Sequence, residues 1–517
     1  MAQKDRAQVA AAIDIGSSML SMVIAQSGEN EATELDYLEH PVNLGYETFT
    51  HGRVTFRTLE EMARVLEGFA VAARQYGVES DAMRITATTA LREASNSAYV
   101  LDQLRVKTGI QVEVLEDGQE MATIFKEVLR RMERDGRDTA KPFMMAYIGT
   151  GSVGIAVVQD GNVAFARNVR VGSLKLSQML GETGERTPRF HLILEEYLAA
   201  LTGALRAQVE AFRPSRFIVC GKEIELIANL THTERRDGML GIARTGLSAL
   251  YDEVKLLTPA QVSQKYRLRL EQAEVLLPSL AIYLTLTDFA HADILSPGVE
   301  LSDWLLYERL YPKEARDWNR RFDDSIEASA WEMVRRYHAD RNHAVAVENF
   351  ALVIFDSLKK VHGFSRRERR LLQAAAILHD IGKFVNSKYH DLYSCHLIMD
   401  SNIIGLSTEE VNLVASIARY HSGTLPSLSH AEWAALNPDQ RMTASKLAAI
   451  LRMADALDRS HRQKVRAIEL GERGNELVIY AAADLDITLE EWTFGFKSEF
   501  FTEVFGIRCV LRRKEGQ

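Results

Sequence analysis

Six histidine and aspartate residues in the second half of the chain have the types and order of a metal-dependent phosphohydrolase site. The order is His, His-Asp, His, His, Asp over about one domain length. Imidazole nitrogens and carboxylate oxygens suit Mg²⁺, Mn²⁺ or Fe²⁺ when rigid elements present them. A lone histidine is usually a surface or satisfied residue, so the prediction depends on the ordered set. The predicted divalent-metal ligands are His343, His379, Asp380, His390, His421 and Asp455.

Apolar runs predict the helices that must position these ligands. A strongly apolar helix over 371–378 ends directly before the His-Asp pair, and a helix over 411–420 ends at His421. Asp455 lies inside an apolar helix predicted over 447–457. Because an unpaired buried carboxylate is costly, the apolar neighbours of Asp455 favour a functional role.

This block resembles the HD superfamily of metal-dependent phosphohydrolases, in which a bound metal activates a water to attack phosphorus. The resemblance implies metal binding by His343, His379, Asp380 and Asp455. It implies auxiliary roles, for a second metal or for phosphate, for His390 and His421, and a phosphate- or water-positioning role for Lys383. The role of His396 stays open, since it points away from the site if its helix begins near Tyr393.

The first third of the chain contains two strand–turn–strand units. The turns Asp14-Ile-Gly-Ser-Ser and Tyr147-Ile-Gly-Thr-Gly-Ser resemble the two phosphate loops of the actin-like ATPase superfamily. Glycine turns let backbone N–H groups approach phosphate oxygens, and an Asp at a strand end orients metal or water. The predicted strands of the two units are 9–15 and 20–26, then 143–148 and 154–159.

Other segments resemble the exopolyphosphatase/guanosine pentaphosphatase (Ppx/GppA) family, and together they cover nearly the whole chain. Ala87-Thr-Thr-Ala-Leu-Arg-Glu-Ala-Ser-Asn96 is similar to the Ala-Thr-x-Ala-x-Arg-x-Ala-x-Asn segment of that family. Three further similar segments are 115–122, 296–308 and 484–505. The resemblance implies Asp14 and Glu120 as catalytic residues. It implies phosphate binding by Gly16, Ser17, Arg92, Gly149, Gly151 and Ser152.

The chain departs from the family pattern at positions where the family has catalytic or phosphate-binding residues. Tyr147 stands where the second loop usually has Asp, and Met121 replaces one member of a catalytic Glu-Glu pair. Lys222 follows the third loop's Gly where Thr is usual, and Trp304 replaces a Gly. These changes remove metal-orienting carboxylates and a possible general base, so the sequence predicts a hydrolytically weak or inactive N-terminal site. The retained glycines either still form a phosphate cleft or only keep the turns tight.

The expected fold class is an α/β N-terminal half, with an actin-like ATPase fold of two ribonuclease-H-like subdomains. An all-α HD domain and a small α+β C-terminal module are expected to follow. The predicted domains are 1–135, 136–312, 320–465 and 466–517.

Composition sets the expectations for compartment and partners. The 517 residues carry a formal net charge of −9, which argues against a dedicated nucleic-acid binder. Three scattered cysteines fit a reducing, cytoplasmic location. No signal-peptide core and no membrane span are expected, because no window approaches ~20 uninterrupted apolar residues. The family resemblance makes a homodimer plausible.

Three functions stay open at this point. The first is a Ppx/GppA-type phosphatase, acting on polyphosphate or guanosine pentaphosphate, with a degenerate N-terminal phosphate cleft. The second is an HD metal-dependent phosphohydrolase with a sensory actin-like domain. The third is a non-enzymatic regulator that binds polyphosphate or a guanosine polyphosphate alarmone. A divalent metal (Mg, Mn or Fe) is the cofactor expected for the enzymes.

Overall fold

A computed structural model describes residues 8–29, 31–79, 82–184, 189–401, 403–473 and 476–514. The chain divides into two compact units, which are called unit 1 (Met1–Phe322) and unit 2 (Asp323–Gln517). Each is described by itself.

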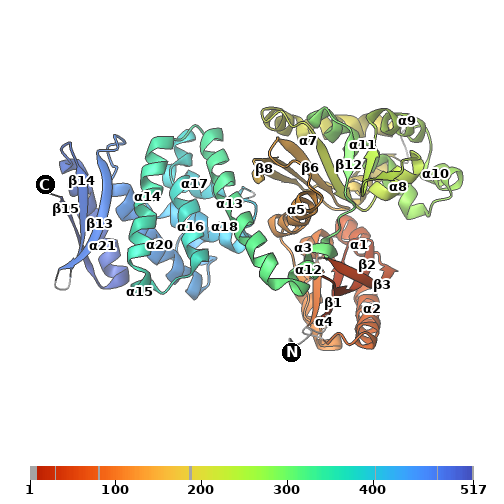
Figure 1. The fold of residues 1–517 in the computed structure, drawn as a ribbon, viewed down its shortest axis with the longest axis horizontal. Helices are drawn as coiled ribbons and strands as arrows, with labels where there is room; N and C mark the ends of the chain where they lie inside the picture. The colour runs from red at the N-terminus through yellow and green to blue at the C-terminus, as the bar shows by residue number, and fades with distance from the viewer. Residues whose placement is uncertain are drawn as a thin grey trace. The chain divides into compact units, whose positions relative to one another are not determined.

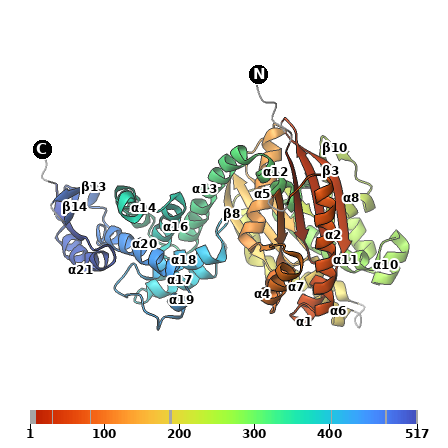
Figure 2. The same cartoon turned by 90° about the horizontal axis from the view of Figure 1, so that it is seen from below.

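The first sheet of unit 1 has the order β3-β2-β1-β4-β5 (Figure 1). β1 and β2 form the predicted antiparallel hairpin, and β4 pairs parallel to β1. Helix α2 begins where the Thr55 side chain accepts the backbone N–H of Thr58, and it packs on the sheet (Figure 2). The strands are β1 (Val9–Ile15), β2 (Met19–Ser27), β3 (Ala32–Pro41), β4 (Met83–Ala87) and β5 (Glu113–Val114). The helices are α1 (Leu44–His51), α2 (Phe56–Gln75), α3 (Thr89–Glu93), α4 (Ser97–Thr108), α5 (Asp117–Arg134) and α12 (Leu301–Leu310), and α12 returns to pack on β1 beside α5.

The second sheet of unit 1 has the order β10-β11-β12-β9-β6-β7-β8 and repeats the pattern of the first. β6 and β7 form the second predicted hairpin, and β9 pairs parallel to β6 as β4 does to β1. The strands are β6 (Phe143–Ile148), β7 (Val153–Gln159), β8 (Asn162–Val169), β9 (Phe217–Gly221), β10 (Arg235–Arg236), β11 (Met239–Ile242) and β12 (Ile294–Ser296). The helices are α6 (Ser173–Gly184), α7 (Phe190–Glu210), α8 (Ile224–Leu230), α9 (Arg244–Val254), α10 (Pro259–Tyr266) and α11 (Leu270–Ala290). This duplicated arrangement places two glycine turns at the ends of corresponding hairpins.

Helix α11 is the one helix in the described part of the chain that is long and apolar enough to cross a membrane. In this structure 67% of its most apolar window is buried. Leu276, Leu280 and Tyr283 pack it into the core of the second sheet. Its apolar character is therefore used in the core of unit 1.

Unit 2 is a helical bundle with a three-stranded sheet at its C-terminal end (Figure 1). Ile479, Phe494 and Phe501 from the C-terminal segment belong to the same buried cluster as the helices. The helices are α13 (Pro312–Arg336), within which the division of the units falls, α14 (Arg341–Ser357), α15 (Lys359–His362), α16 (Arg366–Leu378), the 3-10 helix η2 (Ile381–Phe384), α17 (His390–Met399), α18 (Thr408–Arg419), α19 (Ala431–Ala434), α20 (Pro438–Ala456) and α21 (Thr488–Phe505). The strands are β13 (Val465–Arg473), β14 (Glu476–Ala483) and β15 (Arg508–Arg513).

Local sequence explains where three site-bearing helices of unit 2 begin. Each starts with a capping box, in which the first side chain accepts a backbone N–H three residues later and that later side chain accepts the first backbone N–H in return. The pairs are Ser365 with Glu368 in α16, Ser407 with Glu410 in α18, and Asn437 with Gln440 in α20. Each capping box fixes the residue at which its helix begins, and the regular helix geometry then sets the position of the predicted ligand near the other end.

Candidate functional site

The six predicted ligands lie at helix ends in unit 2. His343 is in the first turn of α14, where the Asp340 side chain accepts its backbone N–H. His379 and Asp380 follow α16, and His390 opens α17. His421 follows α18 and Asp455 is in the last turn of α20. All six side chains are buried or largely buried. The bundle thus directs six polar groups into an apolar interior.

Four of these side chains form a first group of possible ligand atoms. The Nε2 of His343 is 3.2 Å from the Nε2 of His379 and 3.2 Å from Oδ1 of Asp455. Oδ2 of Asp380 is 3.6 Å from the Nε2 of each of these histidines. Two nitrogens and two oxygens at this separation can share one cation.

A second group uses the other oxygen of Asp380. Oδ1 of Asp380 is 3.5 Å from the Nε2 of His390 and 3.7 Å from the Nε2 of His421. Those two nitrogens are 3.2 Å apart. Asp380 therefore faces one group with each oxygen, so it could contribute a ligand atom to both groups.

Hydrogen bonds fix which ring nitrogen each histidine offers. Nδ1 of His379 donates to the carbonyl of Ala376 at 2.8 Å, and Nδ1 of His421 donates to that of Ala418 at 2.6 Å. Because a carbonyl only accepts, the proton is on Nδ1 and the Nε2 lone pair is free. His390 donates likewise from Nδ1 to the carbonyl of Ser387 at 3.0 Å.

The fourth histidine has a carboxylate in place of the carbonyl. Nδ1 of His343 donates to Oδ2 of Asp458 at 2.9 Å. Asp458 is itself held by the backbone and side-chain N–H groups of Gln463. The sequence interpretation missed Asp458, although it lies only three residues after Asp455 in the sequence.

Two further residues at the centre were not predicted. His461 stacks on His343 with ring centroids 3.6 Å apart, and its Nδ1 donates to Asp340 at 3.0 Å. Lys497 of α21 is buried, pairs with Oδ2 of Asp455 and donates to the carbonyl of His421 at 3.0 Å. No local signal distinguishes Lys497, because its contact depends on how α21 packs on α20.

The electrostatics of the centre favour charged carboxylates. Burial opposes ionisation of Asp380, but His379, His421 and Lys383 outweigh it and lower its pKa below the ordinary value. Burial similarly opposes ionisation of Asp455, and Lys497 leads the interactions that lower its pKa. Burial and the nearby His379 lower the pKa of His421, which favours its neutral form. Burial opposes protonation of His343, but its hydrogen bonds to Asp455 and Asp458 outweigh burial and raise its pKa to about 9. Because metal binds neutral imidazole and charged carboxylate, a metal would have to displace a proton from His343.

The remaining predicted residues of unit 2 fall in two places. The Lys383 ammonium pairs with Oδ2 of Asp380 and lies 3.3 Å from Nε2 of His461, so it is at the centre. His396 is exposed, and its ring contacts that of Tyr393. It lies outside the group of ligands.

The structure brings several predicted residues of unit 1 close together, at the position of the predicted phosphate cleft. Asp14 ends β1, with Gly16 and Ser17 in the turn that follows, and Gly149, Gly151 and Ser152 form the turn between β6 and β7. The hydroxyl groups of Thr89 and Ser152 are 3.4 Å apart, and Arg92 donates to Thr89 at 3.0 Å. Arg92 also pairs with Asp117 and lies 3.3 Å from Oε2 of Glu120. The guanidinium of Arg92 is thus already engaged by protein carboxylates.

The unusual residues of this cleft lie against its glycines. A Cβ built on Gly16 would be 3.3 Å from the Lys222 ammonium, and one on Gly149 would be 3.4 Å from the Tyr147 ring. A Cβ on Gly154 would be 2.6 Å from Met121. The space next to three glycines is therefore occupied by side chains of the chain itself.

The cleft of unit 1 is acidic. Burial raises the pKa of Glu120 to about 7, against the opposing effect of Arg92. Burial also raises the pKa of Asp14, although Lys222 lies 3.6 Å away and opposes it. Among the described residues, Oδ1 of Asp14 and Oε2 of Glu223 are buried without a hydrogen-bond partner. These carboxyl groups leave little net positive charge for a phosphate.

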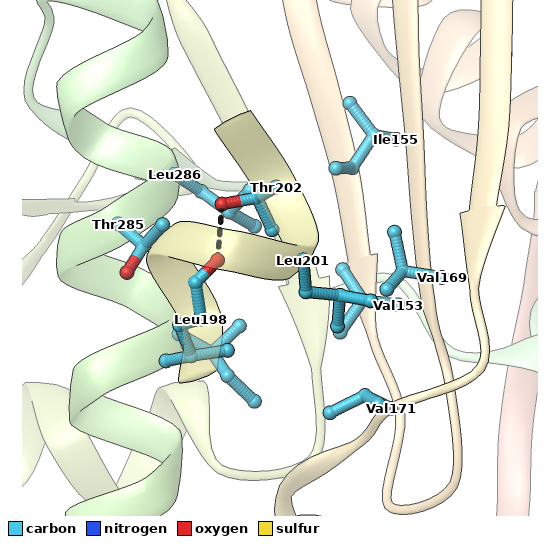
Figure 3. Close-up of a pocket in the computed structure, with 10 residues that line it drawn as sticks. Val153, Ile155, Val169, Val171, Leu198, Leu201, Thr202, Thr285 and Leu286 are labelled. Atoms are coloured by element: carbon cyan, nitrogen blue, oxygen red, sulfur yellow. Dashed lines mark hydrogen bonds between the residues drawn. The ribbon is translucent and has the colours of Figure 1, made fainter. Parts of the chain in front are cut away.

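A cavity between the second sheet and the helices packed on it is lined almost entirely by apolar side chains (Figure 3). Val153, Ile155 and Val169 line one side of it, and Leu198 and Leu286 line the other. The hydroxyl of Thr202 donates to the carbonyl of Leu198 within its own helix, as that of Thr285 does to Ala281. It is a gap in apolar packing.

Comparisons with known proteins place these two sites in context. A model described as "Ppx/GppA phosphatase family" matches residues 23–308, and one described as "Ppx/GppA phosphatase, domain III" matches residues 326–503. The guanosine-5'-triphosphate,3'-diphosphate pyrophosphatase of Vibrio vulnificus is 23% identical over 488 residues, 93% of each chain. That of Vibrio parahaemolyticus is 21% identical over 490 residues, also 93% of each chain.

Solved structures agree on the fold. An exopolyphosphatase from Cytophaga hutchinsonii is similar with a TM-score of 0.51 and 17% sequence identity. The match covers 59% of this chain and 98% of that chain. The similarity supports the predicted actin-like fold.

Proposed function

This chain belongs to the Ppx/GppA phosphatase family, and from that premise we propose that it is a metal-dependent phosphohydrolase whose catalytic centre lies in unit 2. Its relatives are hydrolases of phosphoanhydride bonds, and the proposed substrates are polyphosphate or a guanosine polyphosphate. Unit 1 then contains a degenerate phosphate cleft, and unit 2 contains an HD-type helical domain at 320–465 with an α+β module at 466–517. The observation that carries the proposal is the pair of ligand groups that share Asp380.

The donor set fits divalent metal ions. Four imidazole nitrogens outnumber two carboxylates, and each imidazole has its other nitrogen engaged as a donor. Such a set favours Mn²⁺ or Fe²⁺ over Mg²⁺, which prefers oxygen ligands. His343, His379, Asp380 and Asp455 would hold one ion, and Asp380, His390 and His421 would hold a second.

The residues of the centre have different roles in the proposed reaction. When bound, such ions supply Lewis-acid polarisation of phosphoryl oxygens and activation of water near neutral pH. Lys383 is partly exposed, so its ammonium can hold a phosphate oxygen of the substrate. Asp458 orients His343, and Lys497 keeps one oxygen of Asp455 engaged so that the other faces the ligand group.

The experiment is to compare wild type with Asp380→Asn in metal content and phosphate release. We expect the variant to lose bound Mn²⁺ or Fe²⁺ and at least about a hundredfold in phosphate release from guanosine polyphosphate and tripolyphosphate. Asp400→Asn, an exposed residue of the same unit, serves as the matched control. Full phosphate release by a metal-free Asp380→Asn protein would falsify the proposal.

One observation favours a second candidate, in which unit 1 does the hydrolysis. The pKa of Glu120 is about 7, which suits a general base at neutral pH. In that case Glu120→Gln would lower phosphate release at least about a hundredfold, and Asp380→Asn would leave it unchanged. Because the two variants lie in different units, the paired measurement separates the two candidates.

A further inference from the structure

The side chains of the candidate metal centre differ in their exposure to solvent. The side chains of His343 and His379 are 0% exposed, and Asp455 and His421 are nearly so. In contrast, the side chains of Lys383, His461 and His390 are 36%, 27% and 18% exposed. A substrate must therefore approach past Lys383, His461 and His390.

Two exposed aromatic side chains adjoin two of these three residues in the sequence. Phe384 directly follows Lys383 and is 59% exposed, and Tyr389 directly precedes His390 and is 51% exposed. Phe384 ends η2 and Tyr389 directly precedes α17, and the short connection between η2 and α17 also exposes Val385. Exposed apolar side chains that are grouped in one segment beside polar residues are typical of a binding surface.

The connection is held in a defined conformation. The side-chain oxygen of Asn386 accepts the backbone N–H groups of Lys388 and Tyr389 at 2.8 and 3.1 Å. The carbonyl of Ser387 accepts from Nδ1 of His390. The segment that carries the aromatic rings is therefore tied to a predicted ligand, and the rings are pre-positioned.

Phe384 is supported on one side and open on the rest. Its ring centroid lies 5.7 Å from that of Tyr337 and 6.2 Å from that of His338. Both contacts come from the turn before α14, whose Asp340 pairs with His461. The ring is thus anchored to the rim of the centre while most of its surface remains accessible. Tyr389 differs, because the Lys388 ammonium lies 5.2 Å from its ring centroid.

We propose that Phe384 is a specificity-determining residue that stacks on the base of a nucleoside polyphosphate whose phosphate lies at the metal centre. This inference rests on the proposed function and names the substrate class of that same site. A flat base gains from a flat, exposed ring, whereas inorganic polyphosphate presents only charged oxygens and gains nothing from it. Lys383 is placed to contact phosphate with either substrate, so a change at Phe384 should affect the two substrate classes differently.

The experiment measures kcat and KM for guanosine 5'-triphosphate 3'-diphosphate and for tripolyphosphate, both with Mn²⁺. In Phe384→Ala we expect kcat/KM for the nucleotide to fall about tenfold, mainly through KM, because stacking on one base is worth that much. Hydrolysis of tripolyphosphate should stay within about twofold, and Phe384→Trp should retain the nucleotide preference. Phe496→Ala, which removes a ring of similar exposure on α21, is the matched control.

Equal losses on both substrates, or an unchanged nucleotide KM, would overturn the inference. Binding of the same nucleotide is measured in parallel by calorimetry, with and without Mn²⁺. If wild type hydrolyses neither substrate yet binds the nucleotide about tenfold more tightly than Phe384→Ala, the proposed function fails and the stacking role stands. If wild type hydrolyses both substrates and the variant binds the nucleotide as tightly, the proposed function stands and the stacking role is wrong.

Discussion

The two candidate sites differ in how their buried polar atoms are hydrogen-bonded and arranged. At the centre of unit 2, each histidine engages one ring nitrogen, and the other nitrogen faces a shared interior point. In the cleft of unit 1, Lys222 lies against Gly16 of the first turn and Met121 against Gly154 of β7, while an oxygen of Asp14 has no partner among the described residues. A glycine turn can be retained simply because the hairpin needs it. Burying several polar side chains around one point costs free energy, so their arrangement favours a functional role.

The largest effect is expected where a buried charge loses its partner. Lys497→Met leaves one oxygen of Asp455 unpaired in the interior of unit 2, so we expect the unfolding free energy to fall by about 3 kcal/mol. Urea unfolding of the metal-free protein measures it. Lys497→Arg should recover part of the loss, and Lys514→Met, at an exposed ion pair, should change little. An unchanged midpoint in Lys497→Met would show that this charge pair does not stabilise the centre.

The second effect is a pH dependence in unit 1. Burial raises the pKa of Glu120 from about 4.5 to about 7, so the folded state favours the protonated carboxyl. The stabilising contribution is present below pH 4.5 and is lost as the pH rises through 7. Because Gln does not titrate, Glu120→Gln should gain about 3 kcal/mol relative to wild type between these limits.

Urea unfolding at pH 4.5 and pH 8 tests this dependence, with Glu234→Gln at an exposed position as the control. A constant difference between Glu120→Gln and wild type at both pH values would contradict the raised pKa. It would also weaken the contrast between the sites, since Glu120 would then be as well paired as the carboxylates of unit 2.

The third effect is on metal affinity. Asp458→Asn weakens the hydrogen bond that orients His343, so Mn²⁺ affinity should fall about 10- to 100-fold. Gln463→Ala disturbs the same turn without touching His343 and should lie within about threefold of wild type. Titration with Mn²⁺ gives both values. If the two variants weaken binding equally, the turn and not the carboxylate orients the histidine.

The smallest effect is expected at Lys222. Its side chain is 40% exposed and lies 3.6 Å from Asp14, so Lys222→Met should cost less than about 1 kcal/mol of stability. Phosphate release should change less than about twofold, because the proposed chemistry lies in unit 2. Lys255→Met, at another ion pair of unit 1, is the control. A tenfold loss of phosphate release in Lys222→Met would indicate that hydrolysis takes place in unit 1 and not in unit 2.

The sequence predicted those parts of the molecule that local pattern determines. Both hairpins follow from alternating apolar runs around glycine turns, and the helices before His379 and His421 follow from apolar periodicity and capping residues. The convergence of the six predicted ligands was anticipated from their order. Their roles as metal ligands stay a prediction, as do the four-part domain division, the cytoplasmic location and the homodimer.

Contacts between distant segments could not be predicted in this way. Lys222 meets Asp14, and Lys497 meets Asp455, only after the sheets and helices have packed. No fixed sequence separation marks a lysine that pairs with a buried carboxylate, because tertiary packing determines which carboxylate it contacts. The short strands β10 to β12 were missed for a related reason, since two to four residues carry too little periodicity.

The position of Lys497 in the chain has a consequence for biosynthesis. It lies 42 residues beyond Asp455, the last predicted ligand to be translated. At typical elongation rates the ribosome needs roughly 2 to 8 seconds to add that segment. During this interval all six ligands exist, but Asp455 still lacks its ammonium partner. A chain interrupted between these two residues would therefore lack the ammonium group that offsets the buried Asp455 carboxylate, which disfavours folding of the centre.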